Sequence, residues 1–152
     1  MVDEVLPVVS TILENDIEII KEAELPYARV ELRSDDILAF RPDIKVFSNY
    51  TIPILEEMLE VFKEITEGQP KPYFCDNRYI TGIVNKEEKE FINKHFGEFA
   101  LCTAMVSDST ILKVILNSYN AIYKPDIEIR IFSSEDPAIN WLRQRNIDVE
   151  SK

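Results

Sequence analysis

The sequence predicts an α/β domain built as two layers, with helices on one face of a mixed five-stranded sheet. Short segments of alternating or continuous apolar residues, rich in Ile, Val, Phe and Tyr, predict strands. Longer segments with apolar residues three or four apart predict helices. The two kinds follow one another in the order β-β-α-β-α-β-α-β-α. The domain is expected to cover residues 27–147, after an appended segment at 1–26 and before a tail at 148–152.

The appended segment has no single period. Apolar residues recur at helical spacing in its first half, so an early helix is expected there. Ile17 and Ile19 then alternate with Asp16 and Glu18, which is closer to strand spacing, and Pro26 ends the segment.

Two strands open the predicted domain. Ala28, Val30 and Leu32 alternate with charged residues, which predicts a strand with one polar face. Turn residues at 34–36 lead directly into a second strand at 37–40. Strands joined so closely pair antiparallel.

A long helix and a short strand come next. The helix is expected at 51–67, with Pro53 in its first turn and Gly68 at its end. The strand covers 72–75.

A second helix then leads into a buried strand. The helix begins at Asn85, with Glu88 completing a capping box, and ends at Gly97. The nearly continuous apolar run at 99–106 predicts a central strand, covered on both sides or flanked by neighbours.

The last three elements are a helix, a strand and a helix. Ser107 and Asp108 cap a third helix that extends to about residue 123 and has a wide apolar face. A strand at 127–131 follows, and the final helix begins at Ser134. Polar alternation in the first and last strands indicates either that both are edges or that one sheet face meets solvent. Helices gathered on one face would satisfy both conditions.

Composition excludes several classes of function. The 152 residues carry a net charge of −11, which disfavours contact with phosphate backbones and anionic lipids. No apolar stretch approaches the roughly 20 residues that span a bilayer, and the first residues lack the basic region of a secretory signal. Two cysteines are not a disulfide framework, and they favour a reducing, cytoplasmic compartment.

Three segments resemble the sulphate-transporter and anti-sigma-factor-antagonist (STAS) family, in particular bacterial STAS-like proteins of unassigned function. They are Tyr-Phe-Cys-Asp at 73–76, the strand and turn at 100–108, and the ending at 130–142, in which Arg-x-Phe precedes a helix with Ala and Trp-Leu. The order of elements also resembles that of STAS domains. At the level of fold, the resemblance extends to lipid-binding CRAL-TRIO domains.

The resemblance implies a non-enzymatic domain that binds a protein or a small ligand. In sigma-regulating members, a partner kinase phosphorylates a Ser at the start of the second helix. Here that helix opens at Asn85, and Thr81 lies several residues earlier. The phosphorylation switch is therefore not expected in this chain.

Polar residues at the strand-to-helix junctions are the best candidates for a ligand or partner site, because ligands of open α/β sheets collect beyond the carboxyl ends of parallel strands. The candidates are Asp76, Asn77, Arg78, Asn85, Lys86, Ser107 and Asp108. The alternative interpretation is that they are helix caps and turn residues, which is favoured for the last two.

Catalytic and metal sites are not expected. His95 is the sole histidine, and it lies near a helix C-terminus, where a protonatable group has a structural reason to occur. Cys75 and Cys102 fall on strands predicted to be neighbours; inert buried thiols are favoured over a redox pair. No nucleophile elbow, P-loop, zincin or dinucleotide motif occurs, and no cofactor is expected.

Two functions therefore compete. The first is a regulatory protein-interaction module, most simply a homodimer, whose interface lies on the third helix through Ile111, Ile115, Tyr119 and Tyr123. The alternative is a carrier or sensor of a lipid-like or small apolar ligand, which the density of Phe, Tyr and Ile favours. An enzyme of unrecognised type ranks last.

Overall fold

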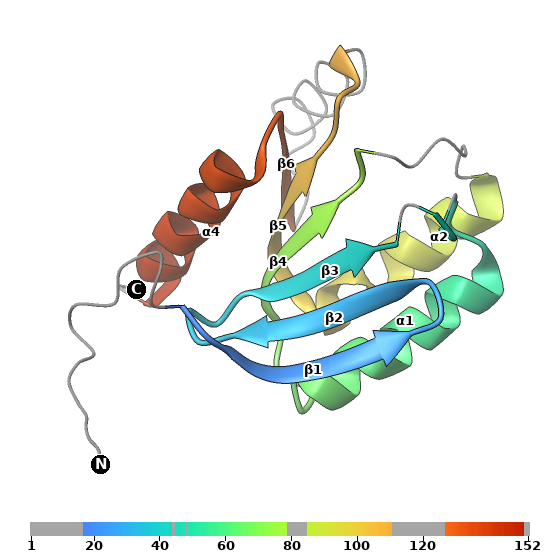
Figure 1. Ribbon diagram of the computed structural model, residues 1–152, viewed down its shortest axis with the longest axis horizontal. Helices are drawn as coiled ribbons and strands as arrows, with labels where there is room; N and C mark the ends of the chain where they lie inside the picture. Colours follow the sequence, from blue (N-terminus) through green and yellow to red (C-terminus); the bar gives the residue numbers. More distant parts are fainter. Residues whose placement is uncertain (1–16, 44, 48, 79–84, 111–126, 151–152) are drawn as a thin grey trace.

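The computed structural model describes residues 17–43, 45–47, 49–78, 85–110 and 127–150. Within them a single sheet has its six strands side by side in chain order (Figure 1). The strands are β1 Ile19–Leu25, β2 Ala28–Arg33, β3 Leu38–Pro42, β4 Lys71–Asp76, β5 Ala100–Val106 and β6 Glu128–Phe132. The helices are α1 Ile52–Ile65, α2 Lys86–His95, the short 3-10 helix η3 Phe96–Glu98, and α4 Glu135–Glu150.

The sheet is mixed, as predicted, but it has six strands and not five. β1 pairs antiparallel with β2, and β2 with β3, whereas β3, β4, β5 and β6 are parallel neighbours. The additional strand β1 comes from the segment predicted to be appended. Ala23 and Leu25 pack against the core while Glu22 and Glu24 stay exposed, so β1 follows the two-residue period of a half-buried strand.

The helices lie on both faces of the sheet, which corrects the predicted two-layer arrangement. Right-handed crossovers between successive parallel strands place α1 and α2 on the same face. α4 follows the last strand, so no crossover constrains it, and it packs on the opposite face against β4, β5 and β6 (Figure 1). The physical reason is that these strands are apolar on both faces: Tyr73 faces α1, and Phe74 faces α4.

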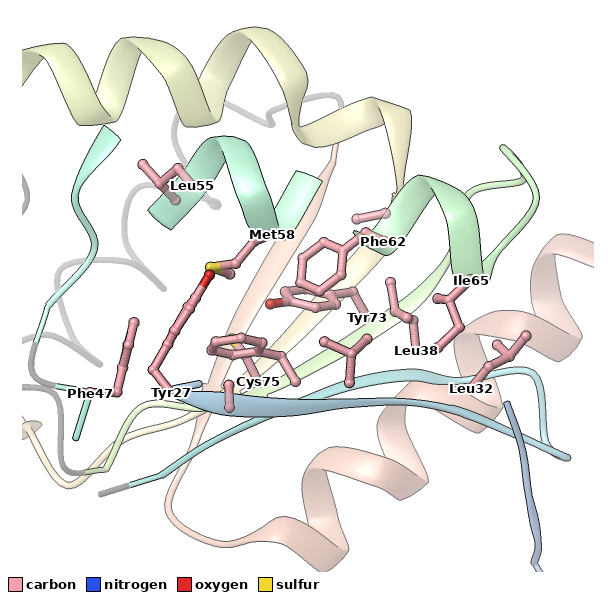
Figure 2. Packing of buried hydrophobic residues seen from close by; sticks show 14 residues of the cluster. Tyr27, Leu32, Leu38, Phe47, Leu55, Met58, Phe62, Ile65, Tyr73 and Cys75 are labelled. Atoms are coloured by element: carbon pink, nitrogen blue, oxygen red, sulfur yellow. The ribbon is translucent and has the colours of Figure 1, made fainter. Parts of the chain in front are cut away.

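The larger core lies between α1 and the sheet (Figure 2). Leu55, Met58, Phe62 and Ile65 project from α1 toward the strands, as the predicted helical stripe required. The sheet contributes side chains from β2, β3 and β4 to this core. They include Val30, Leu32, Leu38, Phe40, Tyr73 and Cys75.

The smaller core lies between α4 and the sheet. Ala138 and Leu142 of α4 are fully buried against β4 and β5. Trp141 lies on this side, 5.9 Å from the ring of Phe132, with the guanidinium groups of Arg130 and Arg145 against its indole.

A charged network continues this second face onto β2 and β3. The Arg41 guanidinium donates to Glu31 from Nε (2.9 Å) and to both carboxylate oxygens of Glu135 at the start of α4 (3.0 Å each). Glu31 also pairs with Arg29 (2.9 Å), and Arg41 lies over the ring of Phe74. We call Arg29, Glu31, Arg41 and Glu135 the Arg41 network.

The ends of α1 and α2 follow the predicted chemistry. Pro53 sits in the first turn of α1, and Gly68 (φ +77°) donates its N–H to the carbonyl of Lys63 after the helix ends. Asn85 and Glu88 form the predicted capping box, each side chain accepting from the other residue's backbone N–H. The predicted third helix lies outside the described residues.

Candidate functional site

A cavity of about 170 Å³ lies between α1, α2 and the sheet. α1 contributes Leu55, Met58, Leu59 and Phe62, and the sheet contributes Tyr73, Cys75, Thr103 and Met105. The α2 side contributes Phe91, Ile92, His95, Phe96 and Phe99, and Tyr50 and Asn77 complete the lining. The described lining is therefore almost wholly apolar and strongly aromatic.

The cavity exists because α2 does not press its apolar stripe fully into the core. Phe91 and Ile92 are only partly buried, and the one buried residue of α2 is Glu88, which belongs to the cap. α1, in contrast, buries Leu55, Met58, Phe62 and Ile65 against the strands. The cavity therefore lies between α2 and the core that α1 forms with the sheet.

Aromatic rings form one wall of the cavity. Phe62 lies with its ring centroid 4.8 Å from that of Phe99 and 5.4 Å from that of Tyr73. Tyr73 and Phe99 are 5.2 Å apart and nearly perpendicular, and Phe96 joins them at 5.4 Å from Phe99. These tilted and edge-to-face arrangements are those that aromatic quadrupoles favour.

Three titratable groups that line the cavity are held neutral. Burial raises the pKa of Tyr73 well above its usual value, and it raises the pKa of the Cys75 thiol to about 12. Burial likewise raises the pKa of Tyr50, whose hydroxyl donates to Asn77 Oδ1 at 2.7 Å. All three therefore stay protonated near pH 7.

Thr103 is the exception among the buried polar groups of the cavity. The residue is 1% exposed, and in the part of the chain that the structure describes its hydroxyl oxygen has no hydrogen-bond partner. Buried hydroxyls usually have one. Thr66, another buried threonine, shows the ordinary arrangement: its hydroxyl donates to the carbonyl of Phe62 at 2.8 Å.

His95 lies at the α2 end of the cavity and is paired. Its Nδ1 is 2.5 Å from a carboxylate oxygen of Glu98, and its ring lies 4.5 Å from that of Phe91. The bond with His95, followed by the one with Lys63, lowers the pKa of Glu98. His95 therefore has a carboxylate partner close to the end of α2, and its structural role stays a prediction.

The polar residues predicted as a site lie at the carboxyl end of the sheet, and several of them already form hydrogen bonds with nearby residues. Asp76 accepts two bonds from the Arg78 guanidinium, at 2.9 and 2.6 Å, and a third from its backbone N–H. The hydrogen bond from that guanidinium is the main cause that lowers the pKa of Asp76, against the opposing effect of burial. Asn77 binds Tyr50 and also lines the cavity.

The other predicted site residues belong to a turn or to the first turn of a helix. Ser107 Oγ accepts from the backbone N–H of Ser109 (3.2 Å), which is turn chemistry, and Asp108 is exposed beside it. Asn85 is the cap of α2, and Lys86 is exposed in the first turn. The predicted interface residues Ile111, Ile115, Tyr119 and Tyr123 lie outside the described residues.

The two cysteines do not form a pair. Cys75 belongs to the core under α1, and Cys102 belongs to the core under α4, so their side chains leave opposite faces of the sheet. Among the described residues no three His, Cys, Asp or Glu side chains gather as a metal site. In the same part of the chain, no helix combines the length and hydrophobicity needed to cross a bilayer.

Sequence reasoning did not single out Thr103. It lies inside the apolar run that predicts β5, between Cys102 and Ala104, which face α4. The available signal was the two-residue period: the lone polar residue of the run must face the side opposite its neighbours. That α2 would leave space there is a tertiary property that the run does not encode.

Comparisons with known proteins agree with this fold. A family described as a domain of unknown function (DUF7793) matches residues 30–146. Among solved structures, the chain is similar to an uncharacterized protein of the DUF3478 family with a SpoIIAA-like fold from Shewanella loihica PV-4. The identity is 17%, the TM-score is 0.54, and the match covers 83% of this chain and 93% of that chain. This likeness confirms the STAS-like prediction at the level of fold. No curated protein matches this chain.

Proposed function

The chain belongs to the DUF7793 family, a domain of unknown function, and on that premise we propose that it is a non-enzymatic domain that binds a small apolar ligand in the cavity between α1, α2 and the sheet. The observation that carries the proposal is the cavity itself. Protein interiors are packed as densely as organic crystals, and voids of this size are few in a domain. Ligand sites are mostly concave, apolar and aromatic, with a small number of polar groups that fix orientation.

The state of the polar groups supports binding without chemistry. A general base or nucleophile must reach its reactive form near the working pH. Burial instead holds the Cys75 thiol and the Tyr73 hydroxyl in their protonated forms, and the Tyr50 hydroxyl donates a hydrogen bond to Asn77. These groups can orient a ligand, but they are poorly prepared to attack one.

Native mass spectrometry of gently isolated protein tests the proposal. We expect a bound species of low mass on the wild-type chain and its loss in Leu59→Trp, which fills the cavity from α1. Leu101→Trp is the matched control, since Leu101 is exposed on β5 outside the cavity. It should retain the ligand.

Circular dichroism and thermal melting would show that both tryptophan variants fold. An apo mass for the wild type, together with equal uptake of apolar probes by wild type and Leu59→Trp, would remove the proposal.

A second candidate function is the regulatory protein-interaction role that the STAS resemblance implies, in the cytoplasm and through a homodimer. The face of the sheet beside α4 supports it. β2 and β3 carry the Arg41 network there, and a groove lined by Ile17, Ile19 and these charged residues runs along it. Ile19 is exposed, which is typical of a contact surface on an otherwise charged face.

Light scattering over a range of concentrations tests this second candidate. A dimer that dissociates in Ile19→Lys but not in Val46→Lys, a change at another exposed apolar residue, would support it. A monomer at every concentration, with no binding to a co-encoded regulator, would contradict it.

A further inference from the structure

We infer that the ligand of the cavity is a neutral molecule with a single aromatic ring and one hydroxyl group, of the phenol class, whose hydroxyl bonds to Thr103. This inference rests on the proposed function and specifies its ligand. Three properties of the cavity, as its described residues form it, lead to this inference: an unpartnered hydroxyl, a lining without a free charge, and a volume that fits one ring.

The unpartnered hydroxyl sets the polar group of the ligand. Thr103 lines the cavity and is almost completely buried, and its Oγ1 has no hydrogen-bond partner among the described residues. Leaving a buried hydroxyl unsatisfied is costly, while pairing it recovers that cost. A ligand hydroxyl can donate to Oγ1 or accept from it, so one such group would complete the site. Thr66, bonded to Phe62, shows that the fold satisfies a buried threonine where no ligand is needed.

The absence of a counter-charge in the lining sets the ligand charge. No Lys, Arg, Asp or Glu is among the described residues that line the cavity. His95, which does line it, already has the carboxylate of Glu98 beside it. A carboxylate ligand such as a fatty acid would enter without a cation to pair with, and a buried unpaired charge is strongly unfavourable. An ammonium ligand would likewise find no free carboxylate among the described lining residues.

The volume of the cavity and its aromatic wall indicate that the apolar part of the ligand is a single ring. A cavity of about 150 Å³ lined by Leu, Ile and Phe is large enough to bind benzene, and this cavity measures about 170 Å³. Phe62, Phe99 and Tyr73 present faces and edges at centroid distances of 4.8 to 5.4 Å from one another. A further ring can join such a cluster in a tilted or edge-to-face orientation.

Calorimetric titration with phenol, toluene and benzoate at pH 7 tests the inference. Toluene has nearly the shape of phenol without the hydroxyl, and benzoate adds a charge. We expect wild type to bind phenol and toluene but not benzoate. In Thr103→Val, which keeps the shape and removes the hydroxyl, the preference for phenol over toluene should fall by roughly three- to tenfold.

Thr66→Val is the matched control, because it removes a buried threonine hydroxyl that does not line the cavity. It should lower thermal stability and leave the phenol-to-toluene preference unchanged. Using the ratio of the two affinities in each variant cancels effects that act on both ligands equally.

The outcomes separate the ligand class from the proposed function. If toluene binds but Thr103→Val leaves the preference unchanged, or if benzoate binds as well as phenol, the ligand class is wrong while apolar binding stands. If Thr66→Val changes the preference as much as Thr103→Val does, Thr103 has no specific role and the inference fails. If neither phenol nor toluene binds and isolated protein carries no ligand, the proposed function fails with it.

Discussion

Replacing Arg41 with methionine should destabilise the protein by about 3 kcal/mol, through the loss of one residue that joins β2, β3 and α4. Methionine retains the length of the side chain but removes all three hydrogen bonds of the guanidinium. The Glu31 side chain is 4% exposed, and it would keep Arg29 as its one remaining partner in the Arg41 network.

The magnitude follows from three contributions. Leaving Glu31 with half of its charge-assisted bonds costs about 1–3 kcal/mol. The pair with Glu135 contributes about 0.5–1 kcal/mol, because that carboxylate is 34% exposed and solvent screens it. The contact of Arg41 with the ring of Phe74 adds about 0.5 kcal/mol.

Urea unfolding measures the loss as a lower midpoint at an unchanged slope. Arg29→Met is the control: Arg29 is 48% exposed and pairs with the same carboxylate, so it should cost at most about 1 kcal/mol. Adding Glu31→Leu to Arg41→Met should recover most of the stability, because it removes the buried carboxylate that lost its partner. A loss below about 0.5 kcal/mol, or a double variant as unstable as the single one, would refute this reasoning.

The pH dependence has a defined sign. The hydrogen bond from Arg41 is the main cause that lowers the pKa of Glu135 below its ordinary value of 4.5. A carboxyl with a depressed pKa stabilises the folded state above its unfolded-state pKa and loses that contribution as the pH falls through the folded-state pKa. The difference between wild type and Arg41→Met should therefore be full near pH 7 and shrink below about pH 4.5.

Three further predictions concern the core, a helix cap and the thiols. Phe62→Ala should cost about 3–5 kcal/mol in urea unfolding, because the ring is 1% exposed in the aromatic wall; a loss under 2 kcal/mol would mean that the site collapses. Asn85→Ala should lower stability by about 1 kcal/mol and Asn85→Ser by much less, and equal effects would argue against the capping box. Cys75 and Cys102, with pKa values raised by burial to about 12 and about 11, should resist a thiol reagent at pH 8 until denaturant is added. Rapid labelling of the folded protein would contradict their burial.

Local chemistry made much of the fold predictable. Pro53 fits the first turn of α1, where a missing N–H costs no hydrogen bond, and Gly68 and the Asn85–Glu88 box fix helix ends through backbone hydrogen bonds. β1 was harder to predict because it is an edge strand with a register shift between Ile19 and Lys21, so its apolar alternation is weak. The position of α4 depends on which faces of β4 and β5 are apolar. The apolar run of β5 predicts that both faces are buried, but it does not identify the helix that packs on each face.

The candidate site was less predictable, for a physical reason. Junction residues such as Asp76 can be identified from their position, but Asp76 bonds to Arg78 two residues away, and Asn77 is the described junction residue that also lines the cavity. The cavity depends on how far α2 stands from the sheet, which no local pattern records. The role of Thr103 likewise depends on its neighbours in space, which the local sequence does not specify.

The placement of Trp141 gives each side of the sheet its own optical signal. It is the single tryptophan of the chain, and it packs against Phe132 under α4, away from the cavity. Its emission therefore follows the docking of α4, whereas near-ultraviolet dichroism of the tyrosines includes Tyr50 and Tyr73 beside the cavity. Coincident melting curves from the two signals would mean that the layers separate in one cooperative step, and an earlier tyrosine transition would mean that the α1–α2 layer loosens first.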